Sequence, residues 1–190
     1  MTARVFETPR LFARRLGADD VDALHAVYGD DEAMRWVGDG QALSREGCAA
    51  WVGVTQRNYA TRGYGMFALL ERAAPAEVVG FAGLVHPGGQ EAAEIKYALR
   101  RSHWGRGLAS EAAAALLSHG ARVHGLRRII ATVDPENLAS QRVLLKAGMQ
   151  LGELRRDADG ALTQYFVWLA PGAGTARAAG QSPGAGSMGP

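Results

Sequence analysis

The chain has 190 residues, of which 47% are hydrophobic and 21% are charged. This length supports one domain with a hydrophobic core and is too short for two domains of ordinary size. The formal net charge of +2 gives no basis for a nucleic-acid-binding protein, and no run of residues is apolar and long enough to span a membrane.

The cysteine and histidine content excludes several kinds of site. Cys48 is the only cysteine, so an intrachain disulfide and a cysteine-based zinc site are both impossible. The five histidines show none of the spacings typical of metal ligands, and no metal site is predicted. Residues 1–15 lack the apolar core of a secretory signal. We therefore predict a cytoplasmic protein in which Cys48 packs as a small apolar side chain.

The first third of the chain predicts one strand and two helices. Alternating apolar and charged residues indicate a strand over 10–15, and apolar residues at helical spacing indicate a helix over 19–28. Ser44 is expected to cap a second helix that runs to about residue 60.

Strands dominate the middle of the chain. Three apolar runs predict strands over 66–71, 78–85 and 93–99. The stretches between them, 72–76 and 86–90, are rich in proline, glycine and small residues and are expected to be turns.

The second half alternates helices and strands. A glycine-rich turn leads into an alanine-rich helix that ends near Gly125, followed by a strand over 127–133. Asp134 is the expected N-cap of the next helix, with Pro135 in its first position and Gly148 after its end.

The final elements complete a fold class. Strands are expected over 151–155 and 164–169. The whole order predicts an α/β (α+β) protein with a mixed, largely antiparallel central sheet and helices on both faces. The single domain is expected to span 5–169, because 170–190 is rich in glycine, proline and alanine, a composition typical of a disordered tail.

The glycine-rich turn, 104–111, is the segment that points most clearly to a ligand. Its sequence is Trp-Gly-Arg-Gly-Leu-Ala-Ser-Glu, between a strand and a helix. The first turn of a helix has unpaired N–H groups and partial positive charge, and glycines let an anion approach the backbone. Arg100, Arg101 and Arg106 add positive charge nearby. A phosphate or pyrophosphate ligand is predicted.

The order of these elements resembles the GNAT superfamily of acetyl-CoA-dependent N-acetyltransferases, and within it the branch that contains ribosomal-protein N-terminal acetyltransferases. The segments that carry the resemblance are 8–11 (Thr-Pro-Arg-Leu), 80–84, 94–97, 104–111, 136–140 and 146–149. The superfamily's pyrophosphate loop is written Q/R-x-x-G-x-G/A. Here Trp104 stands at the leading position, which is common in that branch, whereas Gly107 and Ala109 match.

The resemblance implies a site for acetyl-CoA. Strand 95–99 should splay from strand 127–133, so that pantetheine pairs with the first strand as an added strand would. The implied cofactor-binding residues are Tyr97, Ala98, Leu99, Arg101, Trp104, Gly105, Arg106, Gly107, Leu108, Ala109, Ser110, Asn137 and Ser140.

Two residues are candidates for proton transfer. By the resemblance, Ser140 faces the thioester sulfur and would act as general acid or as hydrogen-bond donor to the thiolate. Glu94 would be the base, directly or through a water. The alternatives are that Asn137 and Ser140 are ordinary polar residues of a first helical turn, and that Glu94 is a solvated carboxylate at a strand end.

The predicted function is acetyl transfer to a primary amine, of a protein N-terminus or a small molecule, by direct transfer in a ternary complex. A dinucleotide or S-adenosylmethionine enzyme is disfavoured, because the turn does not follow the first strand of a βαβ unit and lacks a complete Gly-x-Gly-x-x-Gly. A non-catalytic acyl-CoA-binding module is the other alternative. The sequence does not identify the acceptor; a homodimer is the default for the branch.

Overall fold

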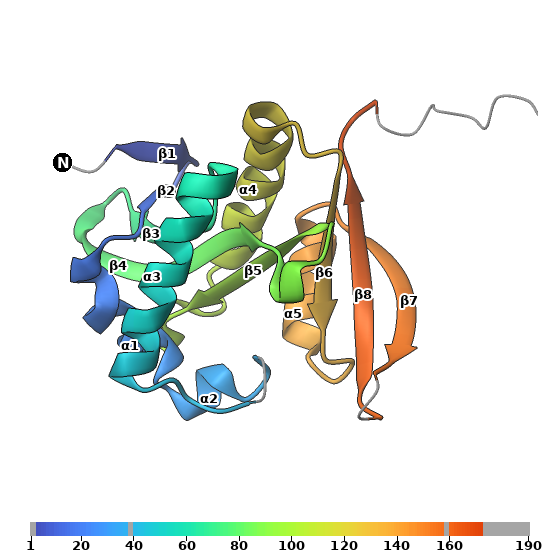
Figure 1. Ribbon diagram of the computed structural model, residues 1–190, viewed down its shortest axis with the longest axis horizontal. Coiled ribbons are helices and arrows are strands. Elements are labelled where there is room, and N and C mark those ends of the chain that lie inside the picture. The colour runs from blue at the N-terminus through green and yellow to red at the C-terminus, as the bar shows by residue number, and fades with distance from the viewer. Residues whose placement is uncertain (1–2, 38–39, 158–159, 173–190) are drawn as a thin grey trace, which may run out of the picture.

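The computed structural model describes residues 3–37, 40–157 and 160–172. Eight strands form one sheet in the order β1-β2-β3-β4-β5-β6-β8-β7 (Figure 1). The strands are β1 Arg4–Glu7, β2 Leu11–Arg15, β3 Met66–Glu71, β4 Ala74–Val85, β5 Ala93–Leu99, β6 Arg128–Val133, β7 Gln150–Arg156 and β8 Leu162–Leu169. Within the described residues, every neighbouring pair is antiparallel except β5 and β6.

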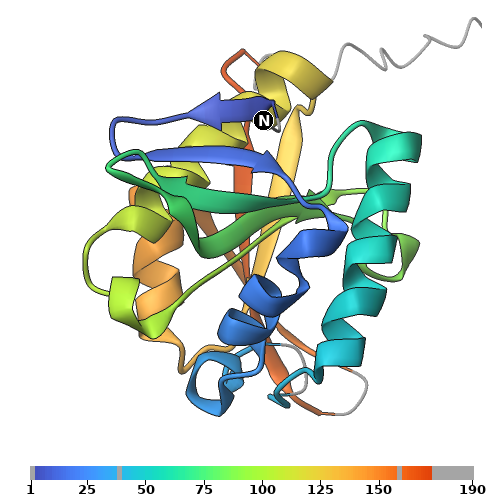
Figure 2. The same ribbon diagram turned by 90° about the vertical axis from the view of Figure 1, so that its left-hand side faces the viewer.

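Helices cover both faces of this sheet, as the sequence predicts. They are α1 Val21–Tyr28, α2 Asp31–Met34, α3 Arg45–Arg62, α4 Leu108–His124 and α5 Leu138–Lys146, with 3-10 turns at Ala18–Asp20, Pro87–Gly89 and Arg101–His103. Figure 2 shows α1 and α3 on one face and α4 and α5 on the other. Each face has its own core: Leu116 and Leu144 belong to one, and Leu24 and Val52 to the other. Cys48 is fully buried in the second core, as expected.

The sequence located some elements well and others poorly. β3 and β5 have the predicted bounds, and Ser44 caps α3 by accepting a hydrogen bond from Gly47 N. The turn predicted over 72–76 is wrong, because Glu71 already pairs with Ala74 and two residues complete the connection. β1 and α2 were not predicted, since four residues are too few to show a period.

The predicted boundary near the C-terminus falls partly outside the described residues. Within them, Ala170 N donates to Arg127 O at 2.9 Å, so the chain still follows the sheet just after β8. The rest of the expected tail, 173–190, lies outside the described residues. The limits of the domain at 5 and 169 therefore stay a prediction.

The parallel pair of strands is the feature that opens the sheet. β5 and β6 pair only through Ala93 with Ile129 and Glu94 with Ile130 within the described residues. β5 continues to Leu99 against β4 alone, and β6 continues to Val133 against β8. The predicted divergence is present, and it leaves one backbone edge of β5 facing a widening gap. We call this gap, between 95–99 and 131–133, the split.

Candidate functional site

The glycine turn lies beyond the C-terminal end of β5, at the start of α4. Gly105 and Gly107 have φ values of 72° and 75°, a backbone conformation that side chains with a Cβ disfavour. The first hydrogen bond of α4 runs from Glu111 N to Gly107 O at 3.2 Å. The N–H groups of 108–110 precede that bond and have no intrahelical acceptor. The turn therefore offers several donors at the positive end of a 17-residue helix, an arrangement suited to an anion.

Trp104 ties this turn to β5. Its indole Nε1 donates to the carbonyl oxygen of Leu99 at 2.8 Å, at the last residue of the strand. Nearly half of the residue is exposed. Trp104 therefore connects the end of the split to the turn through a hydrogen bond of its own and leaves the anion-binding role to the backbone.

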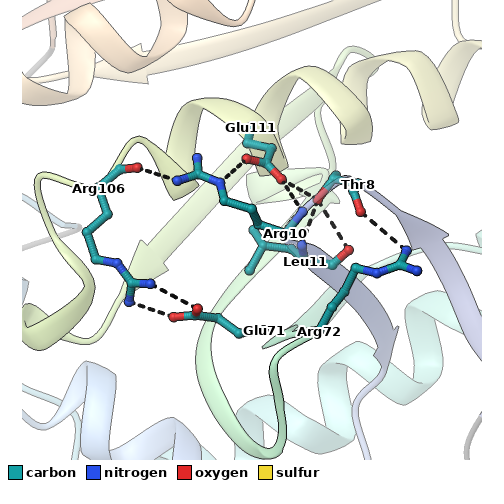
Figure 3. Close-up of polar contacts among 7 residues, drawn as sticks. All are labelled: Thr8, Arg10, Leu11, Glu71, Arg72, Arg106 and Glu111. Carbon is teal, nitrogen blue, oxygen red and sulfur yellow. Dashed lines mark hydrogen bonds and ion pairs between the residues drawn. The ribbon is translucent and has the colours of Figure 1, made fainter.

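The arginines near the turn do not present unpaired positive charge, contrary to the sequence-based expectation. Each one faces a carboxylate: Arg100 and Glu77 at 2.7 Å, Arg101 and Asp30 at 3.4 Å, Arg106 and Glu71 at 2.6 Å. Figure 3 shows both guanidinium N–H groups of Arg106 directed to Glu71. These hydrogen bonds lower the pKa of Glu71 and keep it ionised. The attraction for an anion thus rests on backbone N–H groups and on the helix dipole.

The helix that carries Asn137 and Ser140 begins later than predicted. Asp134 does not cap it: its Oδ1 accepts from Glu136 N at 2.7 Å, which makes a separate turn. Asn137 is the N-cap of α5, and its Oδ1 accepts from Ser140 N at 3.0 Å. The side-chain oxygen of Asn137 is therefore occupied by the cap, and its NH₂ group is the part that is suited to donate a hydrogen bond.

Ser140 contacts Tyr97 across the gap between α5 and β5. The hydroxyl oxygens of the two residues lie 2.8 Å apart, and Tyr97 OH also lies 3.2 Å from the carbonyl oxygen of Ser140. Burial raises the pKa of Tyr97 to about 12, against a smaller opposing effect of the hydrogen bond with Ser140. Tyr97 is thus a neutral phenol near pH 7 and can donate a hydrogen bond to Ser140.

Glu94 is buried inside β5, so the alternative of a solvated strand-end carboxylate is wrong. Only 3% of its side chain is exposed. Its Oε1 accepts from Lys96 Nζ and from the Thr132 hydroxyl, and its Oε2 accepts from Gln90 Nε2 at 3.2 Å. Lys96 Nζ also donates to Thr132 Oγ1 at 3.2 Å, across the split. We call Glu94, Lys96 and Thr132 the Glu94 cluster.

Two members of this environment, Thr132 and Gln90, were missed from the sequence. Thr132 lies on β6, so only the fold brings it to Glu94. Gln90 reaches Glu94 from the turn before β5. The spacing of Glu94 and Lys96 was the one available signal, because residues i and i+2 of a strand share a face.

The two polar groups lie on opposite faces of β5. Tyr97 packs against the core under α4 and α5, whereas Ala98 packs against the core under α1 and α3. By strand alternation, Lys96 shares the face of Ala98. The split therefore has Tyr97 and Ser140 on the α5 side and the Glu94 cluster on the other. A group placed in the split meets a hydroxyl pair on one side and a carboxylate on the other.

Two kinds of feature are absent from the described residues. In residues 3–37, 40–157 and 160–172, no three His, Cys, Asp or Glu side chains gather where they could hold a metal ion. In the same ranges, no helix is long and apolar enough to cross a membrane. The site is thus built from backbone donors, hydroxyl groups and one ion pair.

Comparisons with known proteins identify the family and support the fold. The family model described as an acetyltransferase (GNAT) domain matches residues 10–150. An uncharacterized N-acetyltransferase of Bacillus subtilis strain 168, YoaA, is 33% identical over 164 residues, which are 85% of this chain and 88% of the relative. A GNAT-family acetyltransferase structure from Bacillus anthracis is 26% identical, with a TM-score of 0.73 over 86% of this chain and 96% of that one.

A further solved structure supports the fold alone. It is a ribosomal L7/L12 α-N-protein acetyltransferase in complex with coenzyme A, and it is 22% identical. Its TM-score is 0.74, over 88% of this chain and 98% of that chain. The match to the family model and the relative that is 33% identical over most of both chains decide the assignment. This protein belongs to the GNAT family of N-acetyltransferases.

Proposed function

We propose that this enzyme moves an acetyl group from acetyl-CoA directly to a primary amine in a ternary complex. The family uses acetyl-CoA, and the acceptor is a protein N-terminus or a small molecule. The acetyltransferase unit spans 5–169. The observation that carries the proposal is the split in the sheet, with a backbone anion site at its open end and polar groups on both sides.

The chain offers acetyl-CoA a fitting cradle. A Cβ built on Gly105 would meet no atom within 4 Å, and one on Gly107 would meet only Arg10, at 3.6 Å. No described side chain therefore covers these two positions closely, which supports the approach of an anion to the backbone of the turn. The edge of β5 that β6 leaves beyond Glu94 supplies backbone groups for the amide-containing pantetheine arm.

Ser140 is the proposed proton donor to the leaving thiolate. When Tyr97 donates to Ser140 Oγ, the serine's own proton is available to a group in the split. As the bond between the amine nitrogen and the acetyl carbon forms and the carbon–sulfur bond breaks, the sulfur takes up a proton from Ser140. Ser140 then regains a proton from solvent once the thiol product leaves. A backbone N–H of β5 stabilises the oxyanion.

Glu94 is the proposed base, on the opposite side of the split. The amine must lose a proton, and Glu94 is the buried carboxylate of the Glu94 cluster, which makes this the proposed acceptor side. Because Lys96 already pairs with it, the acceptor amine either replaces the Lys96 ammonium or passes its proton through a water. Both routes return the proton to solvent after transfer.

Ligand-induced stabilisation tests the donor. Acetyl-CoA should raise the melting temperature, since saturation at 100 times Kd adds about 2.7 kcal/mol, whereas NAD and S-adenosylmethionine should not. Thiol release with a panel of peptides, amino acids, polyamines and aminoglycosides, read by mass spectrometry, then tests the transfer. No shift at millimolar acetyl-CoA rejects the donor. Binding without turnover for every acceptor favours an acyl-CoA-binding module instead.

A further inference from the structure

Arg10 reaches the glycine turn from the other end of the chain. It lies between β1 and β2, and its Nη1 donates to the carbonyl oxygen of Arg106 at 2.8 Å (Figure 3). Its Nε donates to Glu111 Oε2 at 2.7 Å, so one guanidinium bridges the turn and the first turns of α4. The Nη2 group lies against Gly107, 3.6 Å from where a Cβ would be.

The bond to Arg106 fixes the direction of the next peptide N–H. In a trans peptide, the C=O and N–H groups point in opposite directions. Because Arg10 holds the carbonyl of Arg106 on its own side, the N–H of Gly107 points away from Arg10. The guanidinium therefore sets the orientation of the Gly107 amide, which directly precedes the free donors of 108–110.

The ion pair between Arg10 and Glu111 neutralises a negative charge beside the anion site. Glu111 lies in the first turn of α4, and its carboxylate accepts from Thr8 Oγ1 at 2.6 Å and from Arg10 N at 2.9 Å. Burial alone would raise the pKa of Glu111, but the hydrogen bonds from Thr8 and Arg10 lower it, so the group is ionised. An ionised carboxylate at a helix N-terminus repels an incoming anion unless a cation neutralises it. Arg10 is that cation.

The neighbouring basic residues do not take this role. Arg106 directs its guanidinium to Glu71. Arg72 belongs to the same corner, yet it donates to Glu7 at 2.7 Å and contacts the Thr8 carbonyl, not the turn. Arg10 is thus the arginine of this corner whose contacts bear on the anion site.

We propose that Arg10 is a positioning residue for the diphosphate of the acetyl donor, acting through the Arg106 carbonyl and the Glu111 carboxylate. The inference rests on the proposed use of acetyl-CoA. It adds a part of the donor site that lies about 95 residues before the turn in sequence.

The test compares donors with and without a diphosphate. Calorimetry measures Kd for acetyl-CoA and for S-acetylpantetheine with wild type, Arg10→Gln and Arg72→Gln. Losing a charge-assisted hydrogen bond corresponds to about 10- to 100-fold in Kd. Arg10→Gln should weaken acetyl-CoA binding by that factor and change S-acetylpantetheine binding less than about twofold, while Arg72→Gln leaves both unchanged.

A double variant distinguishes the effect of the Glu111 charge from a general loss of structure. In Arg10→Gln/Glu111→Gln, the unneutralised carboxylate is gone, and acetyl-CoA affinity should recover at least severalfold over Arg10→Gln. Equal losses for both donors, or no rescue, would overturn the role of Arg10. If circular dichroism shows that Arg10→Gln does not fold, the single variant Glu111→Gln tests the inference instead. Acetyl-CoA binding at least as tight as that of wild type supports the role of Arg10, and weaker binding overturns it. Wild type that binds no acetyl-CoA overturns the proposed function instead.

Discussion

The glycine turn at the open end of the split and the polar cluster around Glu94 are built differently. On the proposed donor side, the turn is held by three hydrogen-bonded contacts, of Trp104 with Leu99, of Arg106 with Glu71 and of Arg10 with the Arg106 carbonyl, while the N–H groups of 108–110 have no intrahelical acceptor. On the acceptor side, Glu94, Lys96 and Thr132 bond to one another. The donor site is preorganised with its binding groups available, whereas the acceptor side uses its polar groups on itself. An acceptor must therefore rearrange contacts that a donor does not meet.

The largest expected effect comes from distorting the glycine turn. Gly107→Val puts a branched side chain at a φ of 75° and against Arg10 Nη2, which displaces the backbone donors of the turn. Acetyl-CoA binding should fall more than about 100-fold by calorimetry. Gly125→Val is the matched control, because Gly125 has a φ of 66° at the other end of the same helix. If both variants lose binding equally, strain rather than the site explains the result.

On the acceptor side, Glu94→Gln should stop proton removal without disturbing the donor. General-base catalysis contributes about 10²- to 10⁴-fold, so kcat should fall by at least about 100-fold while the Kd of acetyl-CoA stays within about twofold. Steady-state kinetics and calorimetry give the two numbers. A weakened Kd would show that the two sides are not independent, and an unchanged kcat removes Glu94 from the mechanism.

Ser140→Ala tests the α5 side and should lower kcat by about 10- to 100-fold with little change in acetyl-CoA affinity. The alanine keeps the backbone N–H that Asn137 caps, so α5 keeps its start. An unchanged kcat would favour the reading of Ser140 as an ordinary polar residue of a first turn.

Tyr97→Phe should have a smaller effect, about threefold to tenfold in kcat, because it removes a hydrogen bond to Ser140 and leaves the serine proton in place. The loss should disappear in the Ser140→Ala background, as expected for residues that act through one another. Additive losses in this double-mutant cycle would contradict the coupling.

The smallest expected effect is a loss of folding stability at acid pH that arises from His119 on α4. His119 on α4 is buried, and burial, together with the charges of His124 and Arg122, lowers its pKa below 6.5. The unfolded chain therefore binds this proton more readily, so stability is full above about pH 6.5 and is lost as the pH falls below it. Thermal melts from pH 7.5 to 5.0 should show a falling Tm, with a shallower slope in His119→Leu; an equal slope would exclude His119.

The sequence predicted the donor side better than the acceptor side for a physical reason. A glycine turn, a strand before it and a helix after it are contiguous, and glycine is required where φ is positive. Ser140 was named through the family resemblance, and its role stays a prediction. The split depends on where β5 and β6 stop pairing, which the family resemblance supplied and strand patterns alone do not.

Long-range partners were beyond sequence reasoning. Thr132 meets Glu94 only because β5 and β6 are parallel neighbours. Arg10 and Glu111 are 101 residues apart in sequence, and no periodicity connects them. The wrong prediction of Asp134 as N-cap has a local cause, because Asp and Asn both favour that position. Asp134 instead accepts the hydrogen bond of a separate turn from Glu136 N, and Asn137 caps α5.

Amide hydrogen exchange with and without coenzyme A tests most directly whether the acetyl donor binds in the split. It reports on the backbone N–H groups of β5 and of the glycine turn, which are the groups proposed to bind the donor. Peptides covering 95–99 and 105–110 should gain protection when coenzyme A binds, while the peptide covering 163–169 on β8 should not change. Protection confined to other segments, or coenzyme A binding with no change at 95–99 and 105–110, would contradict the placement of the donor in the split.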